Sequence, residues 1–321
     1  MDAAVAAGPV SAVPTTLHGC YGLTIDSEIP LPDLGPTVVP GDDVDVTVRR
    51  GPVADPSATA TLLPLGLWRD EGAIGFSVPD IASFLVRDGR EIVVDAAPDA
   101  DPGAVRLFVL GTAMGAVMMQ RGHLVLHGNA FRVGDACAVV VGRSGSGKST
   151  LAAEFLRRGH EVLSDDVVPV DSSGRAVPGY PRIKLWDDAV ARLGLDAADL
   201  DRVTTSVEKF QLPITRPCAE PLPLRWVYVL ERHEGADLGI SPVSGAEAFS
   251  LLHEHTYRNE LLAGEAVLRE HLGQCARLAA GARISRVTRP AATMTAEETA
   301  EAILSDIMGP SAAAGPSLET A

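Results

Sequence analysis

Short stretches that alternate apolar and polar residues recur through the first third of the chain. The segments VDVTVRR, GAIGFSV, SFLVRD and REIVVDAA have the alternating or β-rich character of strands. Clusters of Pro, Gly and Asp such as VVPGDD and APDADPG separate or follow them, and these residues favour turns. The pattern predicts a small β-rich N-terminal domain over residues 16–101, preceded by a loose, Ala/Pro/Val-rich segment at 1–15.

A continuous apolar run, LFVLGTAMGAVMM, comes next, at residues 107–119. It is too short to span a bilayer and is flanked by Arg106 and Arg121. We therefore expect a buried helix over about 102–121 and no membrane partner.

The middle of the chain predicts a strand–loop–helix–strand unit. The strands are LVLHGNAFRV, ACAVVVG and EVLSDDVVPV, and a glycine-rich loop separates the second strand from the helix LAAEFLRRG. Apolar residues at Leu151, Phe155 and Leu156 suit one helix face, and Gly159 suits a C-terminal cap. This unit is the minimum frame for a phosphate-binding loop.

The rest of the chain predicts further α/β structure. LRWVYVLER has the pattern of a strand, and helices are expected near 246–254 and 263–280. Residues 102–308 are therefore predicted to form a second, α/β domain, and the composition of 309–321 predicts a disordered tail.

Composition and charge narrow the classes of partner. Hydrophobic residues make up 46% of the 321 residues and charged residues 21%, which suits a soluble globular protein. The formal net charge of −15 repels phosphate backbones and argues against a nucleic-acid partner. The cysteines form no CxxC pair and the N-terminus lacks the basic region of a secretory signal, so a cytoplasmic location is expected.

The loop GRSGSGKS matches the pattern GxxxxGK[ST] at every fixed position. Glycines let the backbone wrap closely around phosphates at a helix N-terminus, whose dipole favours anions. Lys148 would reach the β- and γ-phosphates, and the Ser149 hydroxyl would bind Mg²⁺. A plain Gly/Ser turn is the alternative, and the strand before the loop and the helix after it count against that reading. The residues expected to bind the nucleotide are Gly142, Ser144, Gly145, Ser146, Gly147, Lys148, Ser149 and Thr150.

Two adjacent carboxylates and one histidine lie near this loop in the predicted sheet. Asp165 and Asp166 could hold magnesium or accept a proton from an attacking hydroxyl, and the alternative is a pair of exposed turn acids. Their apolar strand aims them at the side of the sheet where open α/β sheets bind ligands, which favours a functional pair. His127 ends an apolar run just before the loop strand and could lie beside Asp165, although its spacing fits a structural histidine equally well.

The His-Gly pair at 127–128, the glycine-rich loop and the Asp pair at 165–166 resemble the C-terminal kinase domain of HPr kinase/phosphorylase. That bacterial serine kinase is related in fold to the ATP-dependent phosphoenolpyruvate carboxykinases. The family has a His-Gly pair, a Gly-rich loop, then Arg-Gly-His and an Ala-Asp-Asp strand end, and this chain has RRGHEVLSDD in the corresponding place. The match covers roughly residues 120–170 and implies an α/β P-loop kinase core, a mixed sheet with flanking helices.

The resemblance implies a role for each residue. Asp165 would be the base that takes the proton from the acceptor hydroxyl, and His127 would hold or polarise it. Asp166 would position Mg²⁺ together with Ser149, while Lys148 would stabilise the transferring phosphoryl group.

The chain departs from that family after the Asp pair. HPr kinases carry Glu-Ile-Arg-Gly-Leu-Gly there, whereas this chain has PGYPRIKLWDDAVARLG at 178–194. Together with YGLTIDSEIPLPDL, VEKFQLPI and HTYRNELL, this segment is similar to a different branch of HPr-kinase-related serine kinases, which includes those that phosphorylate lasso peptide precursors. The departure counts against HPr itself as the acceptor.

Four cationic residues further on could contact a substrate or a phosphate. Arg182 and Lys184 are two apart on an extended segment, so both could face the site, and a solvated strand edge is the equal alternative. Lys209 precedes a loop that could close on the phosphates, and Arg258 could clamp a phosphate bidentately. A surface position explains each of these last two equally well.

The leading hypothesis is a kinase that uses ATP and Mg²⁺ to phosphorylate a hydroxyl, serine above all, of a peptide or protein such as a lasso-type peptide precursor. The alternatives are a small-molecule hydroxyl kinase, a carboxykinase, simple ATP hydrolysis, and a nucleotide-gated regulator without phosphotransfer. A binding module needs no base beside the γ-phosphate, so the Asp pair and His127 favour a kinase. The sequence leaves open whether the chain forms a homo-oligomer.

Overall fold

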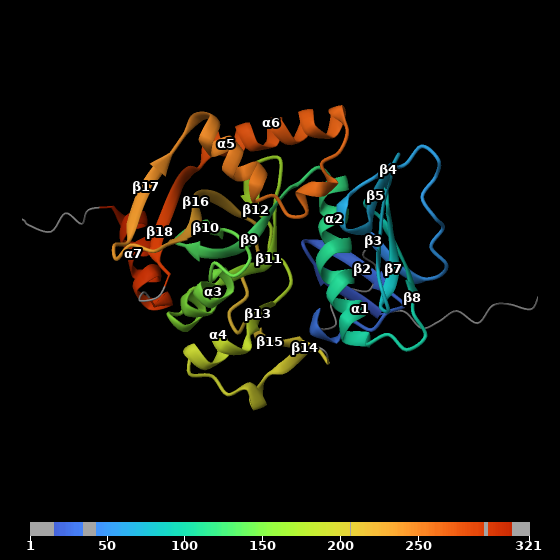
Figure 1. Cartoon of the computed structure of the whole chain (residues 1–321), viewed down its shortest axis with the longest axis horizontal. Coiled ribbons are helices and arrows are strands. Elements are labelled where there is room, and N and C mark those ends of the chain that lie inside the picture. Colours follow the sequence, from blue (N-terminus) through green and yellow to red (C-terminus); the bar gives the residue numbers. More distant parts are fainter. Residues whose placement is uncertain (1–15, 35–42, 206, 292–294, 310–321) are drawn as a thin grey trace, which may run out of the picture.

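The computed structural model describes residues 16–34, 43–205, 207–291 and 295–309. Within these ranges the chain forms two large sheets with a helical rod between them (Figure 1). The predicted loose segment 1–15 and nearly all of the predicted tail 309–321 lie outside the described residues.

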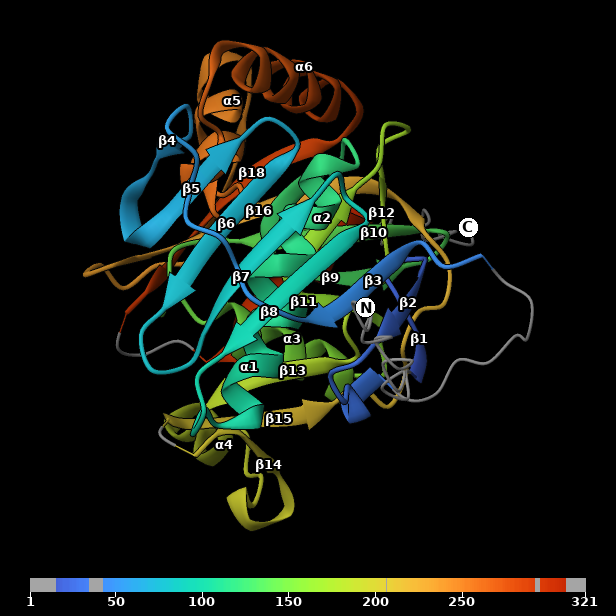
Figure 2. The same cartoon turned by 90° about the vertical axis from the view of Figure 1, so that its right-hand side faces the viewer.

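The N-terminal sheet contains eight strands, and Figure 2 shows it face on. The strands are β1 (Thr16–Cys20), β2 (Leu23–Ser27), β3 (Val46–Arg50), β4 (Thr61–Leu62), β5 (Leu67–Asp70), β6 (Ala73–Val78), β7 (Ala82–Arg87) and β8 (Glu91–Ala96). Their order in the sheet is β1-β2-β3-β8-β7-β6-β5-β4, and only β3 pairs in parallel, with β2 and with β8. Buried residues alternate with less buried ones in β1, β2, β3 and β8, as a period of two predicts, whereas β6 and β7 each bury three consecutive residues.

The apolar segment at 102–120 forms the rod. Its parts are α1 (Pro102–Phe108), a π-helical turn η3 (Val109–Ala113) and α2 (Met114–Gln120). The Asp101 carboxylate accepts a hydrogen bond from the Gly103 N–H at 2.8 Å and caps the start. By length and composition the rod could cross a membrane, yet 67% of its apolar window is buried within the structure. It packs in one core with the N-terminal sheet and with Val125 and Val167 of the second sheet, so the predicted buried helix is confirmed.

The second sheet has seven strands and mixes parallel with antiparallel pairs. The strands are β9 (Leu124–Val133), β10 (Ala136–Val141), β11 (Val162–Val170), β12 (Arg175–Ala176), β16 (Leu222–His233), β17 (Gly239–Val243) and β18 (Arg283–Pro290). Strand β9 lies antiparallel between β10 and β11, whereas β16 runs parallel to both β10 and β18. The predicted strands at 124–133 and 136–141 are therefore neighbours.

A small three-stranded sheet and five helices complete the described structure. The sheet has the order β13 (Arg182–Trp186), β15 (Val207–Pro213), β14 (Asp201–Thr204). The helices are α3 (Lys148–Arg157), α4 (Asp187–Arg192), α5 (Gly245–Glu254), α6 (Glu265–Gly281) and α7 (Ala296–Met308), and single turns occur at η1 (Pro32–Leu34), η2 (Pro64–Gly66), η4 (Ala197–Asp199) and η5 (Asn259–Leu261). Helix α3 packs on the second sheet through Phe155, whose ring stacks on Phe131 at 3.7 Å between centroids.

The predicted α/β class, with a mixed sheet, flanking helices and a β-rich N-terminal part, is confirmed. The domain boundary between residues 101 and 102 stays a prediction. Because the rod at 102–120 shares a core with the N-terminal sheet, it belongs structurally to both parts of the molecule.

Candidate active site

The glycine-rich loop leaves the end of β10 and enters α3 at Lys148. Gly145 and Gly147 have φ angles of 76° and 101°, in the region that favours glycine. Lys148 is buried, and its Nζ donates hydrogen bonds to the carbonyl oxygens of Gly142 (2.6 Å) and Arg143 (3.2 Å). Burial lowers the pKa of Lys148, although the nearby aspartates oppose this effect. The lysine is thus held against the loop, where a phosphate would meet its charge.

Strand register brings the His-Gly pair and the Asp pair together. Gly128 in β9 lies opposite Val141 of β10 on one side and opposite Asp166 of β11 on the other. A Cβ atom at Gly128 would lie 2.4 Å from the Val140 carbonyl oxygen, so the close approach of the strands requires glycine here. Both motifs therefore meet beside the loop, which follows β10 directly.

Asp165 is buried and lies beside the loop serine. Its carboxylate accepts hydrogen bonds from the Ser149 hydroxyl (3.1 Å to Oδ1) and from the Lys184 backbone N–H (3.0 Å to Oδ2). Burial, and then the charge of Asp166, raise the pKa of Asp165. The sequence-based hypothesis paired Ser149 with Asp166. The structure pairs it with Asp165 instead, because Asp166 adopts a φ of 76° and its carboxylate contacts other partners.

Asp166 contacts His127 and Lys184. Its Oδ1 lies 3.2 Å from His127 Nδ1, and its Oδ2 accepts a hydrogen bond from Lys184 Nζ at 3.0 Å. Burial would raise the pKa of Asp166, but Lys184 and His127 outweigh it and hold the pKa well below its ordinary value. Asp166 is therefore ionised at neutral pH, between a lysine and a histidine.

Ser149 and Asp165 have the chemistry to hold Mg²⁺. This ion prefers oxygen ligands and often combines one or two carboxylates with phosphate oxygens. The described part of the chain contains no group of three or more His, Cys, Asp or Glu side chains that could hold a metal, so phosphate oxygens and water would complete the coordination of an ion held by Ser149 and Asp165. The hydroxyl of Ser146 in the loop is buried without a hydrogen-bond partner among the described residues, which also suits a bound phosphate.

Two cavities meet at Asp166. The phosphate cavity, of about 210 Å³, is lined by the loop residues and Asp165. A second cavity, of about 510 Å³, lies between the rod and residues 254–260, and we name it the acceptor cavity for the role that we propose for it. The residues that line both are His127, Ser144, Asp166, Lys184 and Lys209.

The structure brings some of the four predicted downstream cations to these cavities. Lys184 and Lys209 line both of them, and Arg258 lines the acceptor cavity alone. Arg182 lines neither cavity and donates a hydrogen bond to the Pro181 carbonyl oxygen at 3.3 Å. The structure therefore does not bring Arg182 to the site.

Asn129, Tyr257 and Arg232 are among the residues at the site that were not predicted. The buried Asn129 donates from Nδ2 to the Lys148 carbonyl oxygen (2.7 Å), which ties β9 to the first turn of α3. Tyr257 packs beside His127, with 5.8 Å between ring centroids, and Arg232 lines the phosphate cavity from the end of β16. Asn129 is two positions from His127, so strand alternation could have indicated it. Tyr257 and Arg232 reach the site only through the tertiary fold.

A glycine-rich loop between β10 and α3, with a Ser–Asp pair and a His–Asp pair beside it, defines a P-loop protein of mixed α/β fold. No protein-family model matches the chain. The HPr kinase/phosphorylases of Clostridium botulinum (strain Eklund 17B / Type B) and Clostridium beijerinckii are 30% and 32% identical to it over 91 and 89 residues. The HPr kinase/phosphorylase of Stenotrophomonas maltophilia (strain K279a) is 29% identical over 107 residues.

These three alignments cover 28%, 27% and 31% of this chain, in the order given. The chain spans only about a third of the length of each relative, namely 30%, 30% and 34%. A solved structure, the Hpr(Ser) kinase/phosphatase from Coxiella burnetii, is 12% identical with a TM-score of 0.29, over 57% of this chain and 95% of that one. Over part of its length the chain is thus related to the HPr kinase/phosphorylases, which confirms the resemblance of residues 120–170 to that family. The similarity to the branch that includes lasso peptide kinases stays a prediction.

Proposed function

We propose that this chain is an ATP-dependent kinase that transfers the γ-phosphoryl group to a hydroxyl group of an acceptor. The observation that carries the proposal is the meeting of two cavities at His127, Asp166 and Lys184. A donor phosphate in the phosphate cavity and an acceptor in the acceptor cavity would meet at an ionised carboxylate. The partial relationship to HPr kinase/phosphorylases supports the same class of reaction.

The geometry favours exchanging the roles that the sequence suggested for the two aspartates. Asp166 borders both cavities and is oriented by His127 and Lys184, so it would accept the proton of the acceptor hydroxyl. Asp165 lines the phosphate cavity alone and contacts Ser149, so these two would hold Mg²⁺. Bound Mg²⁺ supplies neutralisation of phosphate charge.

In the proposed transfer one bond to the γ-phosphorus forms and another breaks. The acceptor oxygen forms a bond to the γ-phosphorus while the bond from the γ-phosphorus to the bridging oxygen breaks, which leaves ADP. Asp166 takes the hydroxyl proton, and Lys184 holds its pKa low enough for it to be ionised beforehand. Lys148 and Lys209, both lining the phosphate cavity, would place positive charge beside the phosphoryl oxygens.

A serine of a peptide or protein is the acceptor to test first. The relatives are named as kinases of HPr, which makes a protein acceptor a candidate. The similarity of the sequence to a different branch makes lasso-type peptide precursors another candidate acceptor. A small-molecule hydroxyl is the second candidate, because an acceptor cavity of about 510 Å³ falls within the usual range of small-molecule sites.

The test uses γ-labelled ATP, Mg²⁺ and a panel of acceptors: serine peptides, lasso-type precursors, HPr and small alcohols. Wild type is expected to label at least one acceptor and Lys148→Ala none. Arg182→Ala removes the same charge outside both cavities and should keep the activity. Nucleotide binding without ADP formation would contradict the kinase and favour a regulator, whereas ADP with free phosphate and no labelled acceptor would favour hydrolysis.

A further inference from the structure

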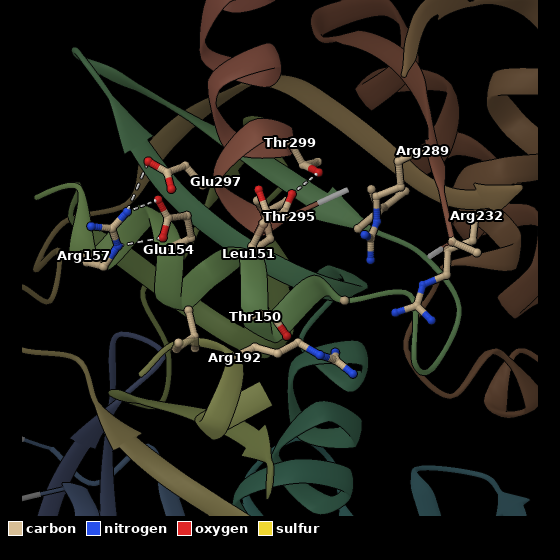
Figure 3. A pocket seen from close by; sticks show the side chains of 15 residues that line it. Thr150, Leu151, Glu154, Arg157, Arg192, Arg232, Arg289, Thr295, Glu297 and Thr299 are labelled. Atoms are coloured by element: carbon tan, nitrogen blue, oxygen red, sulfur yellow. Dashed lines mark hydrogen bonds and ion pairs between the residues drawn. The ribbon is translucent and has the colours of Figure 1, made fainter. Parts of the chain in front are cut away.

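A third cavity, of about 660 Å³, adjoins the phosphate cavity (Figure 3). It shares Gly147, Thr150, Arg192 and Arg232 with the phosphate cavity and no residue with the acceptor cavity. The three cavities therefore form a row with the phosphate cavity in the middle. A nucleotide whose γ-phosphate faces Asp166 would extend in the direction of the third cavity.

Arginine side chains gather where the third cavity meets the loop. Figure 3 shows the guanidinium groups of Arg192, Arg232 and Arg289 at one end, and the cluster of Glu154, Arg157 and Glu297 at the other. Burial, and then the charges of Arg232 and Arg192, lower the pKa of Arg289. Positive charge is thus concentrated beside the phosphate-binding loop of a chain whose formal net charge is −15.

Arg232 differs from the other arginines of this cavity in its contacts. In the described part of the chain its guanidinium has no hydrogen-bond or ion-pair partner, and it is exposed. A Cβ atom at Gly147 would lie 3.9 Å from Arg232 Nη2, which places the guanidinium directly beside the residue that precedes Lys148. The other three have partners: Arg157 with Glu154 (2.8 Å), Arg192 with Asp188 (2.6 Å) and Arg289 with the Ser146 carbonyl oxygen (2.7 Å).

We propose that Arg232 binds a phosphate group of the donor nucleotide and that the third cavity receives its nucleoside. This inference rests on the proposed function, since it requires the loop to hold a nucleoside triphosphate. A guanidinium matches phosphate geometry bidentately, and no described residue engages the guanidinium donors of Arg232. The cavity combines apolar residues such as Leu193 and Leu230 with polar ones such as Thr299, a lining suited to a base and a ribose.

Binding of two probes tests the arginine: the non-hydrolysable ATP analogue AMPPNP and inorganic tripolyphosphate, each with Mg²⁺. Arg232→Gln should weaken both by about tenfold or more, because it removes charged hydrogen bonds to phosphate. Arg232→Lys should recover part of the lost affinity, since lysine keeps the positive charge but lacks the paired N–H donors of the guanidinium. The control Arg225→Gln makes the same charge change at the other, exposed end of β16 and should leave both affinities unchanged.

Ala291, an exposed residue that lines the third cavity, tests the place of the nucleoside. Ala291→Trp narrows the cavity and should weaken AMPPNP but not tripolyphosphate, which has no nucleoside. The inference would be overturned if Arg232→Gln left the affinity for both probes unchanged, or if Arg225→Gln weakened binding of the probes as much as Arg232→Gln does. It would also be overturned if Ala291→Trp bound AMPPNP as tightly as wild type.

The outcomes separate this inference from the proposed function. Wild type that binds neither probe contradicts the proposed function and the inference together. If wild type binds nucleotide and labels an acceptor, and Arg232→Gln binds both probes as tightly as wild type, the inference is contradicted while the proposed function stands. Thermal unfolding of each variant checks that the exposed substitutions leave the fold intact.

Discussion

Two adjacent aspartates in β11 have opposite electrostatic environments. Burial raises the pKa of Asp165, whereas Lys184 and His127 hold the pKa of Asp166 below its ordinary value despite burial. The positive φ of Asp166 sends its carboxylate to the junction of the two cavities and leaves Asp165 with Ser149. The sequence predicted that the two aspartates form a functional pair, but the division of roles that we propose depends on a backbone conformation that adjacency alone does not indicate.

Replacing Lys184 by Gln should move the acidic limb of the kinase pH profile to higher pH. Lys184 lowers the pKa of Asp166, so its removal raises that pKa, and the carboxylate protonates earlier as the pH falls. The pH dependence of kcat measures this shift.

Lys184→Arg keeps the positive charge and should restore most of the wild-type profile. A Lys184→Gln enzyme with an unmoved acidic limb would show that Asp166 is not the group that titrates.

Strand β9 positions the site because it lies between the strand that leads into the loop and the strand that carries the Asp pair. The hydrophobic pattern predicted both neighbours of β9, since β10 is fully buried and β11 nearly so. Strand β18 was not predicted, because Arg283, Arg286 and Arg289 interrupt its apolar pattern. Helix α7 was not predicted either, although the capping box of Thr295 and Glu298 marks its start in the sequence.

Gly128→Ala should destabilise the fold and reduce phosphotransfer. The added methyl group would lie 2.4 Å from the Val140 carbonyl oxygen, so β9 and β10 would have to separate, at a cost of about 1–3 kcal/mol. Urea unfolding measures the change in the free energy of unfolding.

The matched control is Gly281→Ala, the last residue of α6, where the added Cβ atom meets no heavy atom within 4 Å. It should leave stability unchanged or raise it slightly. Equal stability of wild type and Gly128→Ala would contradict the close approach of the two strands.

One apolar core joins the N-terminal sheet to the second sheet. It contains Phe84 of the N-terminal sheet, Met114 and Val117 of the rod, and Val125 and Val167 of the second sheet. The sequence predicted a buried helix and two domains, but not that the helix belongs to both, because periodicity does not identify the surfaces that a helix contacts. The acceptor cavity lies against this rod, so the N-terminal sheet supports the site indirectly.

The two sheets should therefore unfold together in one cooperative transition. Variants that keep only Trp68 (in β5) or only Trp226 (in β16) report on the two sheets separately by fluorescence. The same denaturant midpoint is expected for both tryptophan variants. Unfolding of either sheet would expose apolar surface of the rod that the two sheets bury together, so the other sheet would lose stability as well. Two well-separated midpoints would contradict a shared core.

Asp166→Asn and Asp165→Asn should differ both in single-turnover transfer of γ-labelled phosphate and in Mg²⁺-dependent binding of AMPPNP. The cavity junction predicts that Asp166→Asn keeps nucleotide binding while its transfer rate falls by about 10²–10⁴-fold. Asp165→Asn should instead weaken the Mg²⁺-dependent binding, since it removes the partner of Ser149. Transfer at the wild-type rate by Asp166→Asn, with Asp165→Asn inactive but binding normally, would contradict the assignment.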